Sequence, residues 1–282
     1  MARCIVELLA VVCLAASAAV ADQSEPTYQG RTLSDWTREI DPCTTFGYEP
    51  PAWAAIRHMG TNTIPTLLRW MSESDPPEPP KPHLAPCFNM SRSKRAEMAF
   101  SILGETARPA IPRLTKLALT LTNRNRYDGC IGALAYIGPA SLPSFNAILT
   151  AGTPDRRFAA MDWLPAIHTN CGSLLPALLE CLVSKNADVG WKAADAIGGL
   201  GVPASVVVPA LTNALPTASA PARARIFRCL YWLNVSAPEA VPAIRTGLSD
   251  PNSEVRTNAT YAAERIAPEL LTKHEAKKGR RP

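Results

Sequence analysis

Cysteine and histidine are the residues of this sequence best suited to metal binding, and their spacing fits no metal site. The chain has no Cys-x-x-Cys pair, whereas structural zinc sites draw their ligands from closely spaced pairs. The histidines are scattered and match no zinc spacing. They are His58, His83, His168 and His274. We therefore expect neither a metal nor another cofactor.

The motifs of the common enzyme classes are missing as well. The chain has no G-x-S-x-G, H-E-x-x-H or phosphate-loop motif, and no G-x-G-x-x-G between a strand and a helix. A glycine cluster, Gly198-Gly199-Leu200-Gly201, stands just before Pro203, where it is typical of a helix end rather than a phosphate cradle. We therefore predict that the protein is not an enzyme.

A recurring proline marks the elements that must position any functional residue. Each of these prolines follows an aliphatic residue, and their successive spacings are 47, 31, 33, 33 and 33 residues. A period near 33 indicates a repeat architecture. Because proline is tolerated in the first turn of a helix, we predict that each one begins a helix. The prolines are Pro65, Pro112, Pro143, Pro176, Pro209 and Pro242.

The residues two and six positions after each proline are apolar, and this spacing places them on one helical face. A second, alanine-rich helical pattern precedes each proline and a seventh follows the last. These patterns cover residues 52–60, 93–104, 127–138, 156–168, 189–201, 221–234 and 253–267. We therefore predict an all-α protein, with an α-solenoid of about seven helix pairs over residues 51–272. In each pair, helix A is followed by the proline-initiated helix B.

Two segments depart from the repeat. Residues 22–50 lack it, but Leu33, Trp36 and Ile40 share one helical face, and Ser34 or Thr32 can cap that helix. We read this segment as a cap over the first repeat, with a ligand site built on Trp36 as the alternative. Residues 72–92 form an inserted proline-rich loop, which is either a stiff spacer or a polyproline-type binding segment.

The two ends of the chain predict export. Residues 1–21 have a positive start, a charge-free apolar run of 14 residues and a small-x-small end, as a signal peptide does. An uncleaved anchor is the alternative, but the run is short for a spanning helix. We expect an exported chain, periplasmic, envelope-associated or extracellular, with no transmembrane segment after cleavage. Residues 273–282 form a basic tail.

Charge and cysteine content limit the partners and the covalent links. The net charge is +5, of which the tail contributes +4, so the body lacks the basic stripe of a nucleic-acid-binding protein. Export permits disulfides, and Cys43 with Cys87, which flank the first helix pair in loop-like sequence, is our candidate bridge. Cys4 and Cys13 belong to the predicted signal peptide, and the other four cysteines lie in or beside helical patterns and are expected to be buried. They are Cys130, Cys171, Cys181 and Cys229.

The repeat resembles the short HEAT repeats of the phycobilin-lyase-like kind found in many bacterial proteins. Three groups of residues carry the resemblance. They are Leu248-Ser-Asp250-Pro251 with Val255-Arg256-x-x-Ala259, the turn Ile137-Gly138-Pro139-Ala-x-Leu142-Pro143, and the turn Ala237-Pro-Glu-Ala-Val241-Pro242. Two further segments are similar to exported bacterial HEAT-repeat proteins of unassigned function. They are Tyr28-Gln-Gly-Arg-x-Leu-x-x-Trp36 and Met59-Gly-Thr-Asn-x-Ile-Pro65-Thr-Leu-Leu68. The resemblance implies a HEAT/armadillo-like superhelix.

The resemblance also implies ladders and a binding face. In HEAT arrays an Asp before helix A and an Arg within it often form ladders between neighbouring repeats, which Asp250 and Arg256 match and Asp188 with Lys192 matches loosely. A solvated surface pair of little energetic worth is the alternative for both. In such arrays helix B lines the concave side. The positions four after each proline then form the candidate partner surface. They are Arg69, Lys116, Ala147, Glu180, Asn213 and Thr246.

These observations favour a monomeric, non-catalytic scaffold that binds another protein, and not nucleic acid, through the helix-B surface. Two alternatives stay open. One is an envelope-associated protein that contacts anionic surfaces with its basic tail. The other is a lyase or chaperone-like factor for cofactor attachment, implied only by the repeat type.

Overall fold

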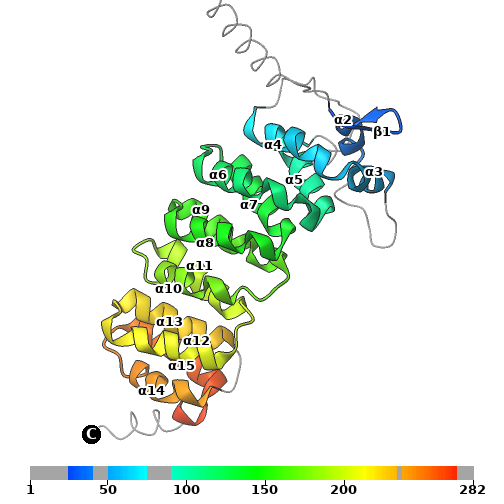
Figure 1. Cartoon of the computed structure of the whole chain (residues 1–282). Coiled ribbons are helices and arrows are strands. Elements are labelled where there is room, and N and C mark those ends of the chain that lie inside the picture. The colour runs from blue at the N-terminus through cyan, green and yellow to red at the C-terminus, as the bar shows by residue number, and fades with distance from the viewer. Residues whose placement is uncertain (1–24, 41–49, 75–89, 234–236, 272–282) are drawn as a thin grey trace, which may run out of the picture. The chain divides into compact units, whose positions relative to one another are not determined.

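The computed structural model describes residues 25–40, 50–74, 90–233 and 237–271. Over these residues the chain is almost entirely helical, with one short antiparallel hairpin (Figure 1). The all-α class is therefore confirmed. None of the described helices has both the length and the apolar character that crossing a membrane requires. Contacts divide the chain into two compact units, residues 1–102 and 103–282, which are described in turn.

The predicted signal peptide and basic tail lie outside the described residues, as do Cys43, Cys87 and most of the proline-rich loop. In the first unit, β1 (Thr27–Tyr28) pairs with β2 (Arg31–Thr32) and leads into α2 (Leu33–Thr37). The 3-10 turn η1 (Gly60–Thr63) connects the next two helices. The remaining helices are α3 (Pro51–Met59), α4 (Ile64–Ser72) and α5 (Arg92–Leu103), the last of which ends at the boundary between the units.

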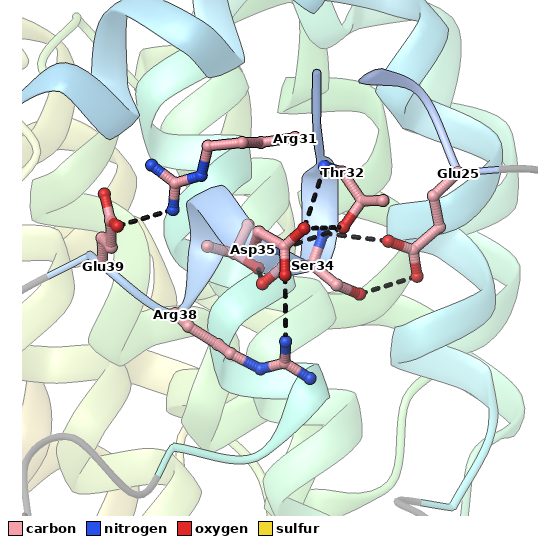
Figure 2. Close-up of polar contacts among 8 residues, drawn as sticks. Glu25, Arg31, Thr32, Ser34, Asp35, Arg38 and Glu39 are labelled. Atoms are coloured by element: carbon pink, nitrogen blue, oxygen red, sulfur yellow. Dashed lines mark hydrogen bonds and ion pairs between the residues drawn. The ribbon is translucent and has the colours of Figure 1, made fainter. Parts of the chain in front are cut away.

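A network of short-range polar contacts fixes the start of α2 (Figure 2). Thr32 and Asp35 form a capping box, in which Thr32 Oγ1 accepts from the Asp35 N–H at 3.2 Å and Asp35 Oδ2 accepts from the Thr32 N–H at 3.1 Å. The Glu25 carboxylate accepts from the backbone and the hydroxyl of Ser34, at 2.9 and 2.7 Å. Hydrogen bonding to Thr32 lowers the pKa of Asp35. Of the two predicted caps, Thr32 is the one that forms.

The buried side of this segment agrees with the predicted helical face. Leu33, Trp36 and Ile40 are all buried, although α2 already ends at Thr37. The Trp36 indole N–H donates to the carbonyl of Tyr28 at 3.1 Å, which holds the ring against the hairpin. The segment also packs on the first helix of the pair, since α2 and β1 both contact α3. Its role as a cap stays a prediction.

In the second unit, helices of type A and type B alternate along the chain (Figure 1). The A helices pack in series, α7 on α9, α9 on α11, α11 on α13 and α13 on α15. Among the B helices, α6 packs on α8 and α8 on α10. The A helices are α7 (Arg124–Ile137), α9 (Pro154–Trp163), α11 (Ala187–Gly199), α13 (Ala220–Leu233) and α15 (Ser253–Ile266). The B helices are α6 (Ile111–Thr120), α8 (Leu142–Ala151), α10 (Leu175–Leu182), α12 (Ala204–Ala214) and α14 (Val241–Gly247).

Five of the six repeated prolines stand in the first turn of a B helix, as predicted, each after a 3-10 turn. Pro209 is the exception, since it lies inside α12, which already begins at Ala204. The residues that form a 3-10 turn in the other repeats extend the helix here, behind an N-cap at Pro203. Because proline has no N–H, the carbonyl of Ser205 loses its helical partner.

The predicted apolar stripe is confirmed at the residue two positions after each proline, which is fully buried in all six repeats. These residues are Leu67, Leu114, Phe145, Leu178, Leu211 and Ile244. The residue six positions on is also buried in five repeats. Leu215 of the α12 repeat is half-buried instead, which matches the displaced helix start at Pro209.

One turn uses an unusual residue. Gly104 and Gly201 each stand eight residues before a repeated proline and have positive φ angles of 50° and 68°. His168 takes the same place before Pro176, with φ 51° and ψ 33°. A residue with a Cβ rarely adopts this left-handed conformation. His168 is therefore held there by the turns on either side of it.

Candidate functional site

The predicted helix-B residues lie on separate helices. Lys116 on α6, Glu180 on α10, Asn213 on α12 and Thr246 on α14 are exposed, and Arg69 on α4 of the first unit is half-buried. The set contains cations, an anion, an amide and a hydroxyl. It forms no track of one charge, and its role stays a prediction.

The four described cysteines are buried and carry free thiols. Burial raises the pKa of the thiols of Cys171, Cys181 and Cys229. Since the thiolate is the reactive form, the raised pKa disfavours the reactive state of these thiols. Their burial agrees with the prediction that they act as small apolar residues. The pairing of Cys43 with Cys87 stays a prediction.

Ion pairs between neighbouring repeats include the expected ladder at Asp250. Arg223 on α13 holds Asp250 with two hydrogen bonds of 2.8 and 2.9 Å. Arg223 belongs to the preceding repeat, so Asp250 takes part in a ladder between neighbouring repeats as expected. Arg256, the other residue expected in a ladder, donates to the backbone carbonyls of Asp250 and Pro251.

At the looser match, Lys192 also pairs with a neighbouring repeat, but its acidic partner is not Asp188. Lys192 on α11 forms an ion pair with Asp162 on α9, not with Asp188 of its own helix. A second contact, Arg228 to Asp195 at 2.7 Å, joins α13 to α11. The ion pairs therefore connect successive A helices.

Arginines also bind the carbonyl ends of B helices. The last carbonyls of a helix have no intrahelical partner and carry partial negative charge, so a guanidinium group stabilises them. Arg156 on α9 donates from Nε to the carbonyl of Ala118, near the end of α6, at 2.8 Å. Arg157 donates to the carbonyls of Thr150 and Gly152 at the end of α8.

Arg225 makes the most deeply buried of these contacts. Its side chain on α13 is 3% exposed and donates from Nη1 to the carbonyls of Leu182 and Ser184, both at 2.9 Å. Gly190 on α11 makes room for it, because a Cβ there would lie 2.2 Å from Nη1. Arg225 thus joins α13 to the end of α10 across the start of α11.

A cavity of about 520 Å³ lies beside α11 and the turns that follow α9. Its polar lining includes Asp162 and Lys192, which neutralise each other, together with Asp195, His168 and the buried Cys171. Nucleophilic catalysis requires an activated nucleophile, and burial raises the pKa of the Cys171 thiol. The cavity therefore offers a binding volume but no activated thiol.

A second concave feature gathers exposed aromatic rings on α13 and α15. Tyr231, Trp232 and Tyr261, with Arg228 and Asn258, line a cavity of about 280 Å³, which we call the aromatic groove. Trp232 and Tyr261 are 46% and 49% exposed. The Tyr231 ring lies edge-on to Trp232, with centroids 5.2 Å apart, and 6.2 Å from Tyr261.

Cations surround these rings. The Arg265 guanidinium lies 4.7 Å from the Tyr231 ring centroid, and that of Arg228 lies 5.9 Å from the Trp232 ring. Sequence reasoning missed the groove. One signal in the sequence is the run of large apolar residues at the end of α13. Phe227 and Leu230 fill the buried side of that helix, so the neighbouring Tyr231 and Trp232 are not needed for its packing.

A scan against protein-family models finds no match for this chain, and a search of curated proteins finds no significant relative. The proposed function therefore rests on the sequence and on the geometry of the site.

Proposed function

We propose that this protein is an exported, non-catalytic scaffold, a HEAT-type α-solenoid that binds another protein. The serial packing of the A helices supports the solenoid, because repeats of this kind bury their apolar stripes only against neighbouring repeats. The sequence of residues 1–21 supports export.

The observation that carries the proposal is the aromatic groove. Tyr, Trp and Arg dominate the energetics of protein interfaces, and the groove holds Tyr231, Trp232, Tyr261 and Arg228 around one cavity. Trp232 and Tyr261 keep about half of their surface exposed. Exposed aromatic rings around a cavity are typical of a partner site.

This observation favours the helix-A side of the second unit over the helix-B residues predicted from the repeat. Side chains such as Lys116 and Glu180 are exposed and isolated, and isolated surface charges contribute little binding energy. In this proposal they act at the edge of the contact and set its rate of association.

The test is a cross-linking capture from the cell envelope with four forms of the full chain. We expect the wild type and Lys116→Glu to recover the same protein, and Trp232→Ala to lose it. Tyr136→Ala is the matched control, since Tyr136 is an exposed aromatic residue on α7 outside the groove. Equal recovery by Trp232→Ala, or no protein recovered by the wild type, would contradict the proposal.

A further inference from the structure

We propose that the aromatic groove binds a polyproline-type segment, and that its occupant is residues 72–86 of a second copy of this chain. This inference rests on the proposed function of the groove as a protein-binding site and names its occupant.

The groove has the features that polyproline recognition requires. Extended proline-rich segments dock in grooves lined by aromatic rings, because the ring faces pack against the flat pyrrolidine rings. Tyr231, Trp232 and Tyr261 present three rings around one cavity, and the T-shaped Tyr231–Trp232 pair leaves the two rings at 73° to each other. Such an arrangement forms the walls of a slot rather than one flat surface.

The sequence of the segment has the matching periodicity. A polyproline II helix has three residues per turn, so Pro76, Pro79 and Pro82 share one edge. In that conformation Pro77 and Pro80 would share the second edge, and Glu78 and Lys81, the two charged residues within 76–82, would share the third. Two apolar edges and one charged edge suit a segment that inserts into a groove and keeps its charges in water. A plain spacer has no need of this pattern.

Charge favours the same pairing. Glu73 and Asp75 precede the prolines, and the rings of the groove are accompanied by Arg228 and Arg265. Arg228 is already paired with Asp195, so the acidic groups beside the prolines meet a partly neutralised rim, whose cations favour their approach and raise the rate of encounter.

If the segment comes from a second copy, every chain carries both a proline-rich segment and a groove that can bind the segment of another copy. The segment follows α4 in the first unit, and the groove belongs to α13 and α15 in the second unit. A contact between different surfaces of two copies is heterologous and extends head to tail. Self-association is then expected to rise with protein concentration, in contrast to the monomer that the sequence alone led us to expect.

The first experiment titrates a fluorescein-labelled peptide of residues 72–86 against the full chain, followed by fluorescence anisotropy. We expect saturable binding, weakened at least about tenfold by Trp232→Ala, as for an interface hot spot, and unchanged by Tyr136→Ala. A peptide with Ala at 76, 79 and 82 should bind at least about tenfold more weakly. A peptide in which Glu78 and Lys81 exchange places should bind within about twofold of the parent. Far-ultraviolet circular dichroism verifies that the variants keep their helices.

The second experiment is sedimentation velocity of the full chain over a range of concentrations. We expect the sedimentation coefficient to rise with concentration for the wild type and to stay constant for Trp232→Ala and for the chain with Ala at 76, 79 and 82. No peptide binding, or equal binding by Trp232→Ala, would overturn the inference. Peptide binding without concentration-dependent association would overturn the second copy as occupant. If the peptide fails while Trp232→Ala still loses a captured protein, the inference falls and the proposed function stands.

Discussion

Polar contacts stabilise both ends of the described chain, but the residues that they join are close in sequence at the N-terminal end and far apart at the C-terminal end. In residues 25–40 the network around Thr32 and Asp35 joins residues at most nine positions apart. Between α10 and α15, Arg223, Arg225 and Arg228 each make a contact with a residue 27 to 43 positions away. The N-terminal segment can thus form its contacts locally, whereas the C-terminal contacts exist only once neighbouring repeats have packed.

The largest effect is expected from removing the contact of longest range. Arg225→Met keeps much of the side-chain volume but leaves the carbonyls of Leu182 and Ser184 without their donor. Two buried hydrogen bonds from a charged group outweigh the cost of burying that group, so we expect a loss of roughly 2 to 3 kcal/mol. Urea unfolding measures it.

A second variant disturbs the hydrogen bonds of Arg225 but keeps its charge. Gly190→Ala would place a Cβ against the Arg225 guanidinium and displace it without removing it. We expect a destabilisation similar to that of Arg225→Met. If both variants unfold like the wild type, Arg225 does not hold α13 to α10.

The next effect should depend on pH. Hydrogen bonding to Arg223 lowers the pKa of Asp250 below its ordinary value. Its contribution is therefore fully present above the unfolded-state pKa of about 4 and is lost as the pH falls through the lower folded-state pKa. We expect Asp250→Asn to cost roughly 1 to 2 kcal/mol at pH 7, and less at pH 3.

Urea unfolding of Asp250→Asn and of the wild type at pH 7, 5 and 3 measures this difference. Asp195→Asn is the control, because the Asp195–Arg228 pair is about 40% exposed on both sides. A constant difference between Asp250→Asn and the wild type across these pH values would exclude the linkage.

The same contrast in range explains what could be predicted from the sequence. The helices were predictable because proline, alanine and leucine spacing acts within a few residues, and Leu67 and Ile244 are buried as that spacing requires. The resemblance placed Asp250 in a ladder between repeats, but only the structure identifies its partner as Arg223 of the preceding repeat. Which arginine pairs with Asp250 depends on how the helices pack, and the spacing of residues within one helix carries no information about that packing.

The groove escaped prediction for a related reason. Tyr231 and Trp232 sit outside the repeated stripe, and Tyr261 reaches the same cavity from α15. No period in the sequence joins them. Pro209 is the opposite case. Its spacing follows the repeat and predicts a helix start, but it lies inside α12.

A smaller and local effect is expected at the N-terminal segment. Thr32→Ala removes one half of the capping box, which costs about 1 kcal/mol. Because the contacts there are short in range, the loss should raise amide hydrogen exchange in residues 25–40 and leave α13 and α15 unchanged. Faster exchange in α13 would mean that the two regions are coupled.

The smallest effect is expected at Arg228. Its pair with Asp195 is exposed, so Arg228→Ala should change the free energy of unfolding by at most about 0.5 kcal/mol. Arg225→Met on the same helix supplies the contrast, with the same urea titration. A loss as large as that of Arg225→Met would show that range in sequence, rather than burial, determines the energy of these contacts.

The proline inside α12 has a mechanical consequence. The carbonyl of Ser205 lacks its helical hydrogen bond there, and Leu215 is only half-buried. When the chain is pulled from its two ends, for instance with optical tweezers, α12 should be the first B helix of the second unit to yield. Pro209→Ala would stiffen that point, and the force at which the first step occurs should rise.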